Sequence, residues 1–184
     1  MIKVKNIVLM VLIGAYSFSS CTSSNQDSQD TSSTDRESLV EEIKQLEDTL
    51  SAGSEQKIDR KLAVELLGKS TLFAEKFPED EQSPAYLFRA GNVAVGIGAF
   101  EDAVGYFQAV HKKYESFHRA PDALFLEGFT YENHLKNIEK AKVCYQDFLT
   151  RFPDDELAEQ VKLVLENIDK TPEELVKGFQ NQNE

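Results

Sequence analysis

Few residues in this chain have the types and the spacing that catalysis or metal binding requires. His111 and Glu115 stand four residues apart and would face one metal ion from a single helix, yet no third ligand follows at a fixed spacing. The segment 96–98 lacks both the third glycine of a dinucleotide loop and the lysine and hydroxyl residue of a phosphate loop. We therefore expect His111 on a solvated helix face and predict no catalytic residue, no metal, no cofactor and no small-molecule substrate.

Cys21 is the one residue to which the sequence assigns covalent chemistry. Residues 1–20 begin with two lysines, continue with an apolar run over 7–18 that is shorter than the roughly 20 residues of a membrane span, and end in small residues. This order is typical of a secretory signal peptide. Phe18, Ser19, Ser20 and Cys21 resemble the lipobox of bacterial lipoproteins, although Phe18 stands where an aliphatic residue is usual. The resemblance implies palmitate or a similar lipid on Cys21; an ordinary signal peptide with an incidental cysteine is the alternative.

The segment after Cys21 reads as a flexible tether over residues 21–35. It is rich in serine, threonine and amide side chains and has no apolar residue to bury. By analogy with lipoproteins of enteric bacteria, Thr22 in place of aspartate favours the outer membrane, on its periplasmic or its surface side. Removing residues 1–20 changes the formal net charge from -12 to -14, because Lys3 and Lys5 are lost with no acid. A chain this acidic is a poor partner for nucleic acid.

Beyond residue 36 the apolar residues recur at intervals of three and four, so the folded part is expected to be entirely α-helical. Helix starts are marked by Thr34 with Glu37 and by prolines that follow Ser83, Ala120 and Thr171. The predicted helices cover residues 36–50, 57–76, 84–96, 100–114, 121–134, 138–151, 155–168 and 172–179.

A repeat with a period of 37 to 38 residues organises these helices. KFPEDEQSPAYLFRAG at 76–91 is matched in register by KYESFHRAPDALFLEG at 113–128, and RFPDDELAEQVKLVL opens a third copy at residue 151. Residues 83–116 and 120–153 each form a helix-turn-helix unit that resembles a tetratricopeptide repeat. The residues that carry this resemblance are Leu87, Gly91, Ala103 and Phe107 in the first unit, and Leu124, Gly128, Tyr131, Ala141, Tyr145 and Pro153 in the second. Ala94 and Glu115 replace the tyrosine and the proline of the family pattern.

The resemblance implies an all-α solenoid of about three units over residues 36–168, closed by a capping helix at 155–168. Residues 169–184 would form a short helix and a frayed tail. Within each unit we expect the glycine at the helix crossing, an alanine opposite it, and the aromatic ring one turn further on, filling the gap to the next helix.

Residues 36–77 lack the family motif, and two interpretations of their first helix stay open. Leu39, Ile43, Leu46 and Leu50 would form the inner face of a packed helix. The same residues fit a heptad, so a self-associating coiled-coil spacer, similar to the stalk of the periplasmic Tol-Pal coordinator of cell division, is the second interpretation.

The resemblance also implies a partner-binding groove along the first helix of each unit, which in the family holds an extended peptide or a partner's helix. The corresponding residues are Phe88, Arg89, Asn92, Val95, Asp122, Phe125, Phe129 and Glu132. We therefore expect a non-catalytic, lipid-anchored adaptor that binds another cell-envelope protein. The alternative is a structural subunit of an outer-membrane assembly machine, similar to the tetratricopeptide lipoprotein of β-barrel assembly.

Overall fold

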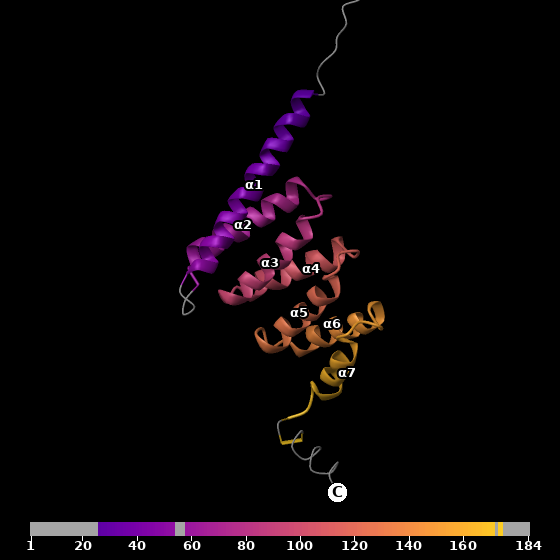
Figure 1. Cartoon of the computed structure of the whole chain (residues 1–184). Helices are drawn as coiled ribbons and strands as arrows, with labels where there is room; N and C mark the ends of the chain where they lie inside the picture. Colours follow the sequence, from indigo (N-terminus) through magenta and orange to yellow (C-terminus); the bar gives the residue numbers. More distant parts are fainter. Residues whose placement is uncertain (1–25, 54–57, 172, 175–184) are drawn as a thin grey trace, which may run out of the picture.

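The computed structural model describes residues 26–53, 58–171 and 173–174 (Figure 1). The predicted signal peptide, Cys21 and the chain after residue 174 lie outside this range. Within it the regular structure is entirely helical, as the repeat pattern predicts. The helices are α1 (Gln26–Ala52), α2 (Arg60–Lys76), α3 (Ser83–Gly96), α4 (Phe100–Lys113), α5 (Ala120–Asn133), α6 (Ile138–Arg151) and α7 (Ala158–Asn167).

Each helix packs on its neighbour in sequence, which produces a stack of hairpins rather than a closed bundle (Figure 1). The hairpins are α1 with α2, α3 with α4, and α5 with α6, while α7 covers α6. The buried apolar side chains fall into three clusters along this stack, one for each hairpin and its junction with the next. The fold is therefore a tetratricopeptide-like solenoid, as expected.

The linkers between hairpins repeat the same hydrogen-bonded turn three times. An aromatic residue ends the preceding helix, at Phe77, Tyr114 and Phe152, with φ between -126° and -129°. Its carbonyl accepts a hydrogen bond from the amide three residues on, at 3.0, 2.9 and 3.2 Å in chain order. The next three-residue step repeats this bond and leads into the following helix. The shared geometry shows that residues 36–77, which lack the sequence motif, occupy the place of a repeat unit.

Close packing inside the hairpins depends on two glycines. A Cβ atom added at Gly91 would lie 2.5 Å from the ring of Phe107, and one added at Gly128 would lie 2.7 Å from the ring of Tyr145. The rings, which we expected one turn further on, are therefore the atoms nearest to the glycines. Ala103 is fully buried in the same cluster.

The turns inside the second and third hairpins differ by one residue, as the longer interval from Gly128 to Ala141 predicts. Gly98 adopts a left-handed φ of 74° between α3 and α4. Lys136 adopts a φ of 52° between α5 and α6, where the extra residue is accommodated. A hydrogen bond from the Asn137 amide to the Tyr131 carbonyl closes the longer turn at 2.8 Å.

The start of α1 corrects the tether prediction. The helix begins at Gln26, so residues 26–35 are helical rather than a coil, and Thr34 lies inside the helix instead of capping it. Two ion pairs hold α1 at residues 35 and 36 to the end of α2 and to the first linker. Arg36 Nε donates to Asp80 Oδ2 at 2.6 Å, and Lys76 Nζ donates to Asp35 Oδ2 at 3.1 Å. These contacts join residues more than 40 positions apart, and helical periodicity does not report them.

The structure also decides between the two interpretations of the first helix. Leu39 and Ile43 are buried, with exposed fractions of 6% and 0%, in a cluster with Leu66, Phe73 and Tyr86 from α2 and α3. The apolar seam that a coiled coil would use is therefore occupied by the chain's own helices.

The other helix ends differ from the predictions by a few residues. The capping helix α7 begins at Ala158 rather than 155, because Asp155 belongs to the third linker and its carboxylate accepts the Leu157 amide at 2.9 Å. At the C-terminal end, Thr171 and Glu174 form a reciprocal capping box, with the Thr171 amide donating to Glu174 Oε2 at 2.8 Å.

Candidate functional site

The predicted groove residues fall into three groups, and Phe88 belongs to the core rather than to a binding surface. Its side chain is 2% exposed and its ring lies 5.9 Å from that of Phe107. The guanidinium of Arg119, at the start of α5, lies over the Phe88 ring, with its central carbon 4.0 Å from the ring centre. Phe88 therefore stabilises the junction between α3, α4 and α5, because α5 closes over it. Val95 is half-buried against the same cluster.

Arg89 and Asn92 form the first exposed group, on α3. Together with Leu50 and Leu66 they line a cavity of about 330 Å³ between α1, α2 and α3. Arg89 Nε donates to Glu47 Oε1 at 2.6 Å, and the guanidinium lies 4.8 Å from the Tyr86 ring centre. The end of α1 thus forms one wall of this site, and the sequence analysis did not include it.

Phe125, Phe129 and Glu132 form the second group, on α5. Phe129 is 41% exposed, and its ring lies 6.2 Å from Phe125 and 6.1 Å from His134. His134 in turn stacks on Phe100 at 4.2 Å with the ring planes 9° apart. Phe100 and His134 lie outside the first-helix pattern that predicted the groove, because they belong to the start of α4 and the turn after α5.

A hydrogen bond from Tyr145 on α6 holds the side chain of Glu132 in place. The hydroxyl of Tyr145 donates to Glu132 Oε2 at 2.8 Å. Burial is the larger cause that raises the pKa of Tyr145 well above its ordinary value, and the neighbouring Glu132 is the second cause. Asp122 Oδ2 accepts a hydrogen bond from Arg119 Nε at 2.8 Å, so its negative charge is partly neutralised by this ion pair. We use the name α3/α5 face for the exposed or half-exposed residues Arg89, Asn92, Phe125, Phe129 and Glu132.

A buried polar network corrects the prediction for His111. The residue is 1% exposed, and its Nε2 lies 2.7 Å from Oε2 of Glu127, which is 4% exposed. Arg151 Nη1 lies 2.9 Å from His111 Nδ1, and Arg151 Nη2 donates to the His111 carbonyl at 2.7 Å. A guanidinium can only donate, so Nδ1 accepts and Nε2 donates to Glu127. The side chain that we expected on a solvated face therefore joins α4, α5 and α6.

The polar side chains of this network bond to one another. Their polar atoms are already directed at one another, and no group of three potential ligands converges in the described part of the chain. No helix among the described residues is both long and apolar enough to cross a membrane.

Comparison with known proteins identifies one repeat in this chain. A family model described as Tetratricopeptide repeat matches residues 122–155, which cover most of α5, all of α6 and the first part of the third linker. No curated protein matches the chain. Repeats of this family are protein-binding scaffolds that are typically not catalytic. The match shows one tetratricopeptide repeat in this chain, and the three equivalent linkers show that its neighbours have the same turn geometry.

Proposed function

We propose that this protein is a lipid-anchored adaptor of the bacterial cell envelope that holds a segment of another envelope protein on its α3/α5 face. The exposed ring of Phe129, supported by neighbouring rings, is the observation that carries the proposal. Aromatic side chains contribute a large part of the binding energy at many protein interfaces.

The surroundings of Phe129 favour binding because its neighbours are already in place. Phe125 and His134 contact it from two sides, and the Tyr145 hydroxyl fixes Glu132 one helical turn away. Little side-chain freedom would be lost when a partner covers this surface, which lowers the entropic cost of binding. Asn92 adds an exposed amide that can donate to and accept from the backbone of an extended segment.

The structure changes how the anchor would present this domain. A helix rises 1.5 Å per residue, so the nine residues of α1 before Asp35, the first residue of α1 with a described ion pair to the hairpin stack, extend the fold by roughly 14 Å. Figure 1 shows this part of α1 projecting beyond the hairpin stack. A lipid on Cys21, on the outer membrane, would then hold the domain away from the bilayer through a helical spacer rather than through a coil.

The binding surface is tested by capturing partners from cross-linked envelopes with the double variant Phe129→Ala and Asn92→Ala. Val143→Ala is the matched control, because Val143 on α6 is 65% exposed but lies outside the α3/α5 face. We expect the double variant to lose specific partners that the control retains. An identical partner set for both proteins would contradict the proposed surface.

The anchor is tested separately by metabolic labelling with a tagged fatty acid. We expect label on the mature chain to disappear with Cys21→Ser and to persist with Cys144→Ser, since Cys144 is buried. Label that survives Cys21→Ser would reject the lipid on Cys21 without affecting the proposal for the α3/α5 face.

A further inference from the structure

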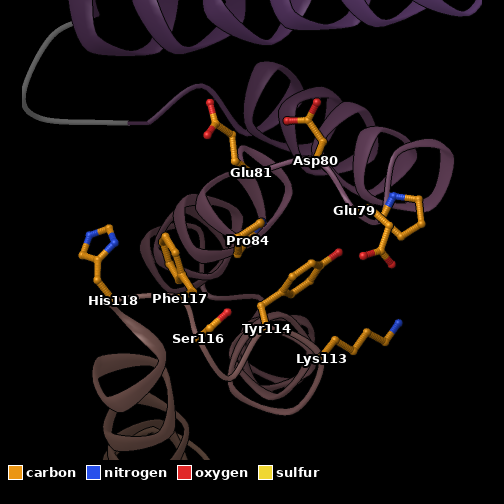
Figure 2. Close-up of a pocket in the computed structure, with 10 residues that line it drawn as sticks. Glu79, Asp80, Glu81, Pro84, Lys113, Tyr114, Ser116, Phe117 and His118 are labelled. Carbon is orange, nitrogen blue, oxygen red and sulfur yellow. The ribbon is translucent and has the colours of Figure 1, made fainter.

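A second surface, on the side of α2 and α4, contains two adjoining cavities. The first, of about 630 Å³, lies between the first and second linkers (Figure 2). Figure 2 shows Glu79, Asp80 and Glu81 on one side of it and Tyr114, Ser116 and Phe117 on the other. The second, of about 520 Å³, runs between α2 and α4. Pro78, Lys113 and Tyr114 line both cavities, so the two form one continuous groove.

The floor of this groove is apolar and its depth depends on a glycine. Leu87, Ala74, Tyr106 and Ala109 line the part between the helices. Gly105 of α4 lines the same part, and a Cβ atom added there would meet nothing within 4 Å. Glycine in the middle of a helix is destabilising relative to alanine, and no contact among the described residues requires it here. Its absent side chain leaves room for an approaching ligand.

The rim of the groove is acidic. Glu75, Glu79, Glu81, Glu101 and Asp102 line it, and none of these carboxylates forms an ion pair among the residues that the structure describes. Lys113 is the one lysine or arginine that lines either cavity.

We propose that this groove binds an amphipathic helical segment of a partner protein, with apolar side chains on one face and lysine or arginine along its edges. The apolar floor and the open position at Gly105 accept the apolar face of a closely approaching helix, which is a common mode of peptide recognition. The unpaired carboxylates of the rim complement its basic edges, and complementary charge speeds association and selects the partner. The groove shares no residue with the α3/α5 face, so the two surfaces can bind different segments.

The experiment measures binding of the full-length chain to a fluorescent 16-residue helical peptide of leucine, alanine and lysine by anisotropy. The comparison peptide has glutamate in place of every lysine. We expect saturable binding of the lysine peptide that weakens as salt is added, and no binding of the glutamate peptide. Equal binding of the two peptides, or none of either, would overturn the proposal.

Two pairs of variants locate the binding site. Glu79→Lys with Glu81→Lys is expected to raise the Kd at least tenfold. Asp154→Lys with Glu156→Lys changes the net charge equally, at the equivalent positions of the third linker, and is expected to change the Kd less than twofold. Equal weakening by both pairs would show that the peptide is attracted by the overall negative charge of the protein rather than by the rim carboxylates, and would reject the groove.

Gly105→Gln tests the floor of the groove without harming the fold. Glutamine favours helix over glycine, and a Cβ atom at position 105 meets no atom of the described residues within 4 Å. The melting temperature is therefore expected to hold or rise while the Kd increases at least fivefold. Gly68→Gln on α2 is the control, because Gly68 is equally open but lines neither cavity. An unchanged Kd for Gly105→Gln would also overturn the proposal.

Discussion

His111 Nε2 lies 2.7 Å from Glu127 Oε2, with both side chains buried between α4, α5 and α6. Arg151 reaches the same ring from the end of α6, across 40 positions in sequence. Gln108 Nε2 donates to the other oxygen of Glu127 at 3.3 Å. The junction between the second and third hairpins therefore contains a polar network as well as an apolar core.

Removing the imidazole is expected to destabilise this junction. His111→Ala leaves Glu127 and Arg151 without their shared partner, and a buried polar group left unsatisfied costs about 1–3 kcal/mol, or more when it is charged. Urea unfolding measures the change in the free energy of unfolding. His118→Ala removes an exposed histidine from the second linker and should change it by less than about 0.5 kcal/mol. Similar values for the two variants would mean that the network contributes nothing.

The glycines of the chain should divide into two classes when each is replaced by alanine. Gly91→Ala and Gly128→Ala force a methyl group against the rings of Phe107 and Tyr145, and overpacking of this kind costs roughly 1–3 kcal/mol. Gly105→Ala meets no atom and should gain about 1 kcal/mol from helix propensity. Thermal unfolding of the three variants checks the order. A stabilised Gly91→Ala would contradict the close contact with Phe107.

The ion pair between α1 and the first linker predicts a specific response to acid. Burial acts to raise the pKa of Asp80, but the hydrogen bonds from Arg36 and from the Gln82 amide outweigh it and the pKa is lowered from 3.8. A carboxyl with a lowered pKa contributes stability above its unfolded pKa, and loses this contribution as the pH falls through the lower, folded value.

Asp80→Asn should therefore lower the urea midpoint at neutral pH. The difference from the unmodified protein should shrink as the pH falls below the unfolded pKa of about 3.9, and it should vanish once Asp80 is protonated in the folded protein. Asp48→Asn changes an exposed aspartate on α1, the helix that carries Arg36, and serves as the control. A difference at Asp80 that persists unchanged in acid would exclude the carboxylate as its source.

The thiol of Cys144 should react very slowly with thiol reagents in the folded protein. Burial, followed by the nearby Glu127, raises the pKa of this thiol to about 12. The thiolate is the reactive form, and each unit of pKa lowers its population tenfold, so modification at pH 8 should be slowed about a thousandfold relative to the unfolded chain. Labelling of the Cys21→Ser protein with a thiol reagent, with and without urea, measures this ratio. Fast labelling without urea would contradict the burial of Cys144.

Much of the local structure could be predicted from sequence because it depends on short intervals. Helices α2 to α6 begin and end within three residues of their predicted bounds, since proline positions, apolar spacing and turn residues act over one or two turns. The equivalence of Lys76, Lys113 and Arg151 was visible for the same reason, because each precedes the aromatic residue of a linker.

The candidate site was predicted less completely, because it depends on which helices meet. Phe88 and Phe125 occupy equivalent sequence positions, yet Phe88 is buried beneath Arg119 while Phe125 is half-exposed and packs on Tyr145. The α1 wall of the Arg89 cavity and the stacking of His134 on Phe100 join different helices. No spacing within one helix reports such contacts.

The sequence by itself determined the period, the helical class and the glycines that allow each hairpin to close. The tertiary structure alone decided that the seam of α1 is covered by α2 and α3, that His111 is buried, and that an acidic groove follows α2 and α4. The physical reason is that periodicity places a side chain on one face of its own helix, whereas burial and pairing depend on the residues that the fold brings to that face from distant parts of the chain.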